Sequence, residues 1–233
     1  MKLDPNRYSA VQRWLGFVEP QHPIVQQLVE EAGGSPAPTQ DAKRTLELLL
    51  KRIRAIRWVG TQGWEPFEKA WDSRTGNCIT LSALLVSALL ACGFYKSYVL
   101  VAGGGLLKQA LVAVSSPKGL LTAHAWALTV LSGGSPFIVD PVRMVAEELG
   151  SVEAFSARLK LAAPVDQILV MVFSNREFHL FANPIACYAY ISRLAQGGEG
   201  YVLRAVRHVS LPGLSGTAED EGRARRWRHL PLR

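Results

Sequence analysis

The sequence has few cysteines, three among 233 residues. An odd number of widely spaced cysteines argues against a disulfide framework and favours a reducing compartment. No pair of cysteine or histidine residues has the spacing of zinc ligands, so we expect no metal site. The glycine run 103–105 lacks the Gly-Lys-Ser/Thr ending of a phosphate-binding loop. These absences predict a protein that depends on neither disulfides nor a bound cofactor.

Long hydrophobic runs are also missing. The longest, residues 79–91, has 13 residues and is interrupted by a threonine and two serines. A membrane-spanning helix needs roughly 20 apolar residues, so this run predicts a buried helix and no membrane span. Residues 1–7 mix charged and polar side chains into the start of the chain, which argues against a secretory signal peptide. We therefore expect a cytoplasmic protein.

Positive charge is concentrated at one end of the chain. The net charge is +7, and residues 222–233 contain five arginines and no acidic residue. We interpret residues 211–233 as a basic, flexible tail that either is only solvated or makes weak contacts with polyanions. Hydrophobic residues make up 48% and charged residues 19% of the chain, which is sufficient for a buried core.

The apolar periodicity and the turn residues predict an α+β domain with an antiparallel sheet. We expect helices over residues 23–33, 41–58, 78–93, around 142–160 and 184–193. We expect strands over residues 98–102, 122–131, 137–140, 168–173 and 201–209, the second and third forming a hairpin. The basic residues of the second helix are interpreted as a solvated face rather than a binding patch: Lys51, Arg52, Arg54 and Arg57.

Cys78 stands where a nucleophile would be expected. It follows Gly76 and Asn77 and begins the apolar helix. In the first turn of a helix, the positive end of the dipole and the free N–H groups favour a thiolate and can stabilise an oxyanion. The alternative is a buried structural cysteine at a helix start.

His124 and Asp140 make the catalytic interpretation stronger. In an extended strand, His124 and Trp126 share one face, while the small residues Ala125 and Ala127 share the other and allow another element to approach closely. Asp140 ends the partner strand and precedes a proline, which favours extended backbone. Across the hairpin, this carboxylate can orient the imidazole and leave its other nitrogen for a nucleophile.

Three motifs in this order resemble the transglutaminase-like superfamily of papain-like cysteine enzymes. They are Gly-Asn-Cys before the apolar helix, His-Ala-Trp on a strand and Val-Asp-Pro at the end of the next, within residues 60–145. The resemblance implies Cys78 as nucleophile, His124 as general acid and base, and Asp140 as the orienting residue. It also implies a core in which the catalytic helix packs on an antiparallel sheet. We then expect an N-terminal helical region at 1–58, a catalytic domain at 59–210 and the tail.

The same resemblance implies a donor near the oxyanion and a cleft for the substrate. The candidates for oxyanion or substrate binding are Trp58, Gln62, Trp64, Trp71, Asn77 and Trp126. For Trp71, packing onto the catalytic helix is the favoured interpretation. Cys92, Cys187 and His179 lie in apolar surroundings and are interpreted as packing residues rather than as catalytic or metal-binding groups.

The expected function is a cysteine-dependent acyl transfer acting on a peptide or protein substrate. The favoured reaction is hydrolysis of a peptide or side-chain amide through a thioester. The two alternatives are transfer of the acyl group to an amine, as in transglutaminases, and a catalytically inactive scaffold that binds a partner through the former cleft.

Overall fold

A computed structural model describes residues 11–33, 42–60, 65–103, 124–131, 134–159 and 168–197. Its centre is a six-stranded antiparallel sheet in the order β6-β5-β4-β3-β7-β8. The expected α+β arrangement with an antiparallel sheet is thus confirmed. The strands are β3 (Ser97–Gly103), β4 (His124–Val130), β5 (Pro136–Asp140), β6 (Val145–Glu148), β7 (Leu169–Phe173) and β8 (Phe178–Phe181).

Helix α5 (Cys78–Ala91) lies against one face of this sheet. Residues 79–89 are all buried, so the helix is enclosed on every side, as expected for one that is apolar all round. Ala125 and Ala127 of β4 are fully buried in the same apolar cluster as α5. These small side chains allow the close packing of helix on strand that the alternation along β4 predicts.

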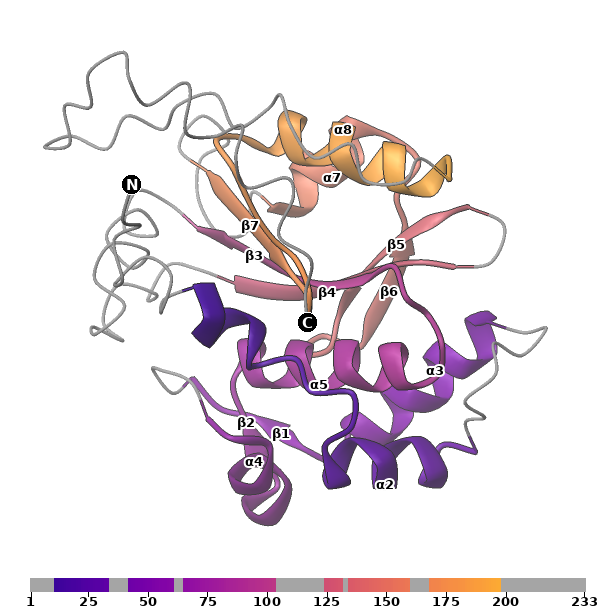
Figure 1. Cartoon of the computed structure of the whole chain (residues 1–233), viewed down its shortest axis with the longest axis vertical. Helices are drawn as coiled ribbons and strands as arrows, with labels where there is room; N and C mark the ends of the chain where they lie inside the picture. Colours follow the sequence, from indigo (N-terminus) through magenta and orange to yellow (C-terminus); the bar gives the residue numbers. More distant parts are fainter. Residues whose placement is uncertain are drawn as a thin grey trace, which may run out of the picture.

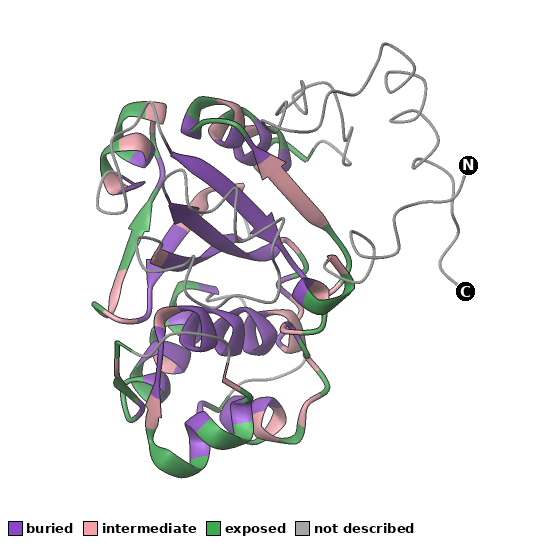
Figure 2. Cartoon of the chain, turned by 90° about the vertical axis from the view of Figure 1, so that its left-hand side faces the viewer, coloured by how far each residue is buried: buried purple, intermediate pink, exposed green. Residues whose placement is uncertain are grey.

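The remaining helices form layers on either side of the sheet and α5 (Figure 1). Helices α2 (Pro23–Glu31), α3 (Ala42–Ile53) and α4 (Phe67–Ser73) pack around α5 on the side away from the sheet. Helices α7 (Val152–Leu159) and α8 (Pro184–Ala195) cover the opposite face, over a second apolar cluster. Figure 2 shows that the central strands and α5 are buried, whereas the outer helices expose their outward faces.

The helix expected over residues 41–58 is shorter than predicted. It ends at Ile53, and Arg57–Trp58 form the short strand β1, parallel to β2 (Thr75–Gly76). The N–H of Arg57 donates to the carbonyl of Arg74 at 2.8 Å, and that of Val59 donates to Gly76 at 3.0 Å. Pairing with a segment 18 positions later therefore overrides the local helical pattern and carries residues 57–58 to the segment that precedes Cys78.

Two further differences concern the second half of the chain. The region 142–160 was expected to be helical, but residues 145–148 form strand β6 on the edge of β5, and only α7 is helical. Alanine and glutamate favour helix locally, and strand pairing overrides that preference. Strand β8, beside β7, was not expected at all. The strand expected over residues 201–209 and the basic tail lie outside the described residues.

Within the described ranges, no helix combines the length and the apolar character needed to cross a bilayer.

The turn between β4 and β5 depends on Gly134. Its φ is +87°, a conformation that non-glycine residues rarely adopt. A Cβ atom at this position would lie 2.9 Å from the backbone oxygen of Ala195 at the end of α8. The hairpin that joins β4 to β5 is therefore fitted against α8 at a point that has no room for a side chain.

We expect Gly134→Ala to lower the free energy of unfolding by about 1–3 kcal/mol, because it combines a strained φ with a backbone clash. Urea denaturation monitored by circular dichroism would measure the change. Gly150→Ala is the matched control, since Gly150 has no heavy atom within 4 Å of a built Cβ. Equal stability of the two variants would contradict this account of the turn.

Candidate active site

Cys78 is the first residue of α5, and Asn77 is its N-cap. The Asn77 side chain accepts a hydrogen bond from the N–H of Thr80 at 2.9 Å. Asn77 is 4% exposed, so it acts as a helix cap and has little surface to offer a substrate. The first turn of a helix leaves N–H groups without partners inside the helix. The cap at Asn77 satisfies the N–H of Thr80.

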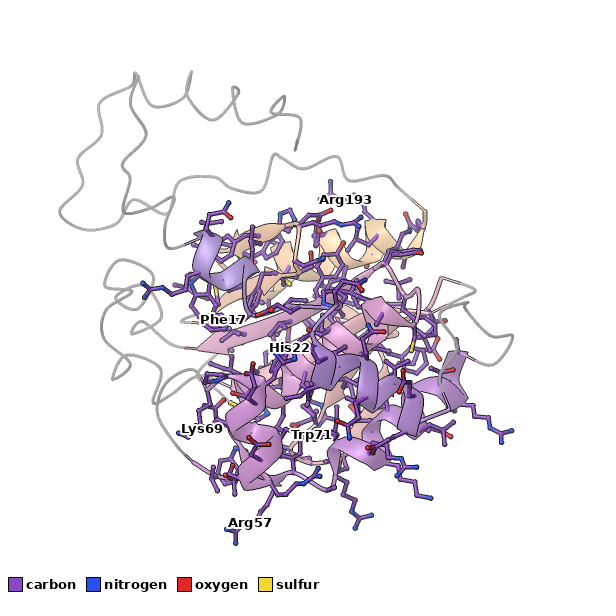
Figure 3. All side chains as sticks on the ribbon, turned by 60° about the horizontal axis from the view of Figure 1, so that its bottom comes forward. Phe17, His22, Arg57, Lys69, Trp71 and Arg193 are labelled. Carbon is purple, nitrogen blue, oxygen red and sulfur yellow. The ribbon has the colours of Figure 1, made fainter. Side chains whose placement is uncertain are left out.

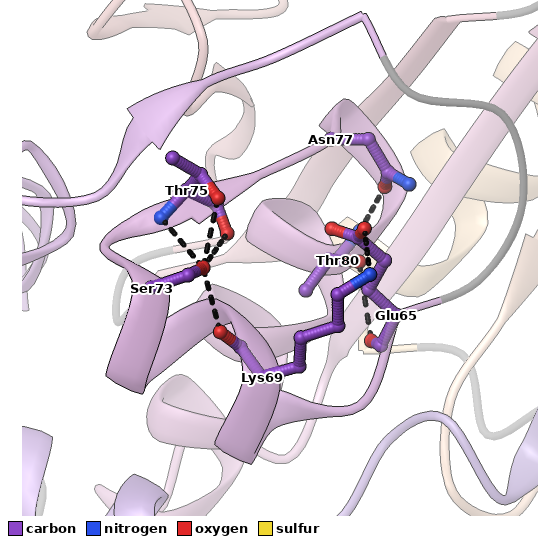
Figure 4. Close-up of polar contacts among 6 residues, drawn as sticks. All are labelled: Glu65, Lys69, Ser73, Thr75, Asn77 and Thr80. Atoms are coloured by element: carbon purple, nitrogen blue, oxygen red, sulfur yellow. Dashed lines mark hydrogen bonds and ion pairs between the residues drawn. The ribbon is translucent and has the colours of Figure 1, made fainter.

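The segment before Cys78 is held in place by side-chain hydrogen bonds (Figure 4). The Thr80 hydroxyl donates to the carbonyl of Glu65 at 3.3 Å. Ser73, at the end of α4, donates to the carbonyl of Lys69 at 2.7 Å and bonds the hydroxyl of Thr75 at 2.8 Å. Together with the pairing of β1 and β2, these contacts fix the backbone that enters α5.

His124 and Asp140 lie at the same end of the β4–β5 hairpin. His124 begins β4, Asp140 ends β5, and Ala127 is opposite Val139 in the antiparallel register. The Nε2 atom of His124 lies 3.0 Å from Oδ2 of Asp140. The side chain of His124 is 23% exposed and that of Asp140 is 2% exposed. The contact that the hairpin predicts is therefore present, and it is largely shielded from water.

Both oxygens of the Asp140 carboxylate have hydrogen-bond partners. Its Oδ1 atom accepts hydrogen bonds from the N–H groups of Val142 at 3.0 Å and Arg143 at 3.1 Å. Burial raises the pKa of Asp140, but the hydrogen bond and charge of His124, followed by the two N–H donors, hold it below its ordinary value of 3.8. The carboxylate is therefore ionised at neutral pH, and its orientation is set by the turn that follows it.

The pKa of His124 depends on Cys78 as well as on Asp140. Burial lowers the pKa of His124, yet the hydrogen bond to Asp140 and the hydrogen bond and charge of Cys78 raise it from 6.5 to about 9. Because Nε2 is engaged by Asp140, Nδ1 is the nitrogen left for the sulfur. The imidazole is thus bonded to a carboxylate and is protonated at neutral pH.

Trp126 packs against His124 and is not exposed to solvent. Its ring lies edge-on to that of His124, with centroids 4.5 Å apart and planes at 86°. The side chain is fully buried on the sheet face away from α5. Its indole N–H has no hydrogen-bond partner in the described part of the chain. In this position Trp126 restricts the ring of His124 and has no surface to offer a substrate.

The other candidates for oxyanion or substrate binding differ from one another in their exposure to solvent. Trp71 is 9% exposed, packs in the cluster around α5 and has the guanidinium of Arg74 4.5 Å above its ring. Packing, the favoured interpretation, is therefore confirmed for Trp71. Trp58 is 50% exposed and lies opposite Gly76 in the β1–β2 pair. Gln62 and Trp64 lie outside the described residues.

The remaining cysteines are buried in packed interiors, as predicted. Cys92 is 1% exposed, and burial raises the pKa of its thiol to about 11. Cys187 is fully buried, which also raises its thiol pKa. Cys78 is partly exposed and differs from both. Within the described residues, no group of three or more His, Cys, Asp or Glu side chains could hold a metal ion.

His179 has polar partners at the other end of the sheet. It bonds Glu177 at 3.1 Å and the hydroxyl of Tyr190 at 3.0 Å, so it is a satisfied histidine as predicted. His22 is likewise engaged: its Nδ1 accepts from the N–H of Ile24, and its Nε2 lies 3.0 Å from Glu68. Of these partners, Tyr190 and Glu68 lie 11 and 46 positions away in the sequence.

Sequence reasoning missed the residues that surround the site after Asp140. Pro141, Val142, Arg143 and Met144 line a groove together with residues of β1. The Nε atom of Arg143 lies 3.9 Å from Oδ2 of Asp140. An arginine three positions after the candidate aspartate was the available signal.

Comparison with protein-family models, with curated proteins and with solved structures found no match to this chain.

The raised pKa of His124 has a consequence for stability. The folded state holds this proton more tightly than the unfolded chain does, so the contribution is full below pH 6.5 and is lost as the pH rises through about 9. We expect the free energy of unfolding to fall over that interval, relative to His124→Gln. Chemical denaturation at a series of pH values would measure the difference.

An NMR titration of the imidazole signals tests the same pKa directly. We expect Asp140→Asn to lower the pKa of His124, because the neutral amide removes one of the groups that favour the protonated ring. His179→Gln is the control and should leave the His124 titration unchanged. A His124 pKa near its ordinary 6.5 in the parent protein, unaffected by Asp140→Asn, would contradict this electrostatic account.

Proposed function

We propose that this protein is a cysteine-dependent acyl-transfer enzyme that hydrolyses a peptide or side-chain amide through a thioester. The observation that carries the proposal is the position of His124, which is bonded to Asp140 at 3.0 Å and interacts with Cys78 at the start of α5. A nucleophile, a base that contacts it and a group that orients the base are the features expected of covalent catalysis.

The chemistry then follows from the three side chains. The Cys78 sulfur attacks the amide carbon, and its proton resides on His124. When the tetrahedral adduct collapses, the C–N bond breaks and the imidazolium gives that proton to the departing amine. Water attacks the thioester and passes a proton to His124, and release of the carboxylic acid frees the sulfur with that proton on His124, as at the start. Asp140 stays ionised and holds the ring throughout.

The oxyanion of each tetrahedral adduct needs donors beside the sulfur. The backbone N–H of Cys78 and the positive end of α5 are the groups that the described residues offer. The ring of Trp126 packs edge-on against the imidazole ring and restricts its orientation. In this proposal, buried side chains orient the imidazole, and the backbone stabilises the charge of the oxyanion.

We assign the chain to the transglutaminase-like superfamily as part of this proposal. The support is the order of the three motifs together with a cysteine helix packed on an antiparallel sheet that carries the histidine and aspartate. Hydrolysis is preferred because Cys78 and His124 are both partly exposed to solvent. Water can therefore reach a thioester, whereas efficient transfer to an amine requires water to be excluded.

Alkylation tests whether Cys78 is activated. We expect iodoacetamide to modify Cys78 rapidly at pH 7, because it is partly exposed in the first turn of α5, and not to modify the buried Cys92 and Cys187 in the folded protein. His124→Gln should slow the reaction roughly tenfold or more. Intact-protein mass spectrometry with time would give the rates.

His179→Gln is the matched control for this experiment, because it changes a histidine outside the site. Its alkylation rate should equal that of the parent protein. Slow alkylation of Cys78 in the folded parent, with no dependence on His124, would favour the inactive scaffold.

A peptide library tests the reaction itself. We expect cleavage or deamidation products that are absent with Cys78→Ala, detected by mass spectrometry. A parallel incubation with a primary amine distinguishes the two chemistries: amide products that contain the added amine would show transfer, and unchanged products would show hydrolysis. A product spectrum identical for the parent and Cys78→Ala would rule out both reactions on the peptides tested.

A further inference from the structure

A groove of about 370 Å³ opens beside the candidate catalytic residues, within the size range of ligand-binding pockets. We call it the arginine groove. Its walls come from the end of α3, β1, α5 and the turn after β5, and the side chains that define it are Arg54, Arg57, Trp58, Leu81, Arg143 and Met144.

The arginine groove adjoins both halves of the site. Trp58 is paired with Gly76, two residues before Cys78. Arg143 and Met144 follow Asp140 in the turn whose N–H groups bind that carboxylate. A ligand in the groove would therefore lie between the segment leading to the sulfur and the segment leading away from the aspartate.

Among the described residues, the positive charge of the groove is compensated only at Arg143. Three arginines line it and no acidic residue does. In the described part of the chain no carboxylate forms an ion pair with Arg54 or Arg57, and the side chain of Arg57 extends outward at the edge of the molecule (Figure 3). Arg143 approaches Asp140 at 3.9 Å, but that carboxylate is already bonded to His124 and two N–H groups.

Several basic residues elsewhere in the described chain do have carboxylate partners. Arg52 on the same helix lies 4.0 Å from Glu31, Lys69 lies 2.8 Å from Glu65, and Arg158 pairs with Glu147. Unpaired arginines around a groove create a positive potential that attracts carboxylates, which guanidinium groups bind through two parallel hydrogen bonds.

The groove also has an apolar component. Trp58 is half exposed, and Leu81 and Met144 contribute aliphatic surface. Met144 has a φ of 55°, a left-handed backbone conformation that is uncommon outside glycine and concentrates at functional sites. A groove lined by both arginines and apolar side chains suits a peptide in which acidic and apolar side chains alternate.

Resting on the proposed function, we infer that the substrate is an acidic peptide whose carboxylate side chains, a few residues from the attacked amide, bind Arg54, Arg57 and Arg143. The arginine groove thereby selects substrates by charge and holds the chain while Cys78 attacks.

Binding can be tested separately from catalysis. The protein used is full-length Cys78→Ala, and the probes are a fluorescein-labelled peptide of alternating glutamate and leucine and its glutamine–leucine counterpart. Fluorescence anisotropy at low salt should show tighter binding of the glutamate peptide. Arg54→Gln/Arg57→Gln should weaken that binding about tenfold or more, and raising the salt concentration should reduce the difference between the peptides.

The control is Lys51→Gln/Arg52→Gln, which removes the same charge from exposed positions of α3 that do not line the groove. It should bind the glutamate peptide like the parent. Equal affinity for the two peptides, or equal weakening by the two double variants, would overturn the inference, as would displacement of the peptide by inorganic polyphosphate at lower concentration than by unlabelled peptide. If Cys78 alkylates rapidly in the parent protein while peptide binding fails, the groove inference falls and the proposed enzyme stands.

Discussion

The hydrogen bond between His124 and Asp140 is the contact on which the proposed chemistry depends. It joins the first residue of one strand to the last residue of its neighbour, so it forms only in the observed antiparallel register. A slip of either strand by one residue would turn that strand's side chain to the other face of the sheet and separate the pair. The pairing of the buried strands β4 and β5 thus places His124 and Asp140 together at the end of the sheet where the helix that carries Cys78 begins.

Packing fixes the position of helix α5 and therefore that of Cys78, its first residue. It is buried all round between the sheet and the N-terminal helices, so neither rotation nor sliding is available without opening the core. The alanines of β4 bring the helix close, and the Asn77 cap fixes where it starts. The sulfur is therefore positioned by a rigid element, while the segment before it is tied to α4.

The sequence was most informative where signals are local. The apolar run with its asparagine cap predicted α5, and alternation with a turn predicted the β4–β5 hairpin, so the three proposed catalytic residues could be named. Longer-range pairing was not visible: β1 depends on a partner 18 positions later, and β6 has the composition of a helix. That is why Arg57 was interpreted as part of a solvated helical face and the arginine groove was missed.

The turn after Asp140 serves two purposes at once. Its N–H groups orient the carboxylate, and its side chains form one wall of the arginine groove. Val142 and Arg143 serve both purposes, because they donate to the carboxylate that orients the imidazole and also line the groove. The orientation of the imidazole and the shape of the groove therefore both depend on one short loop.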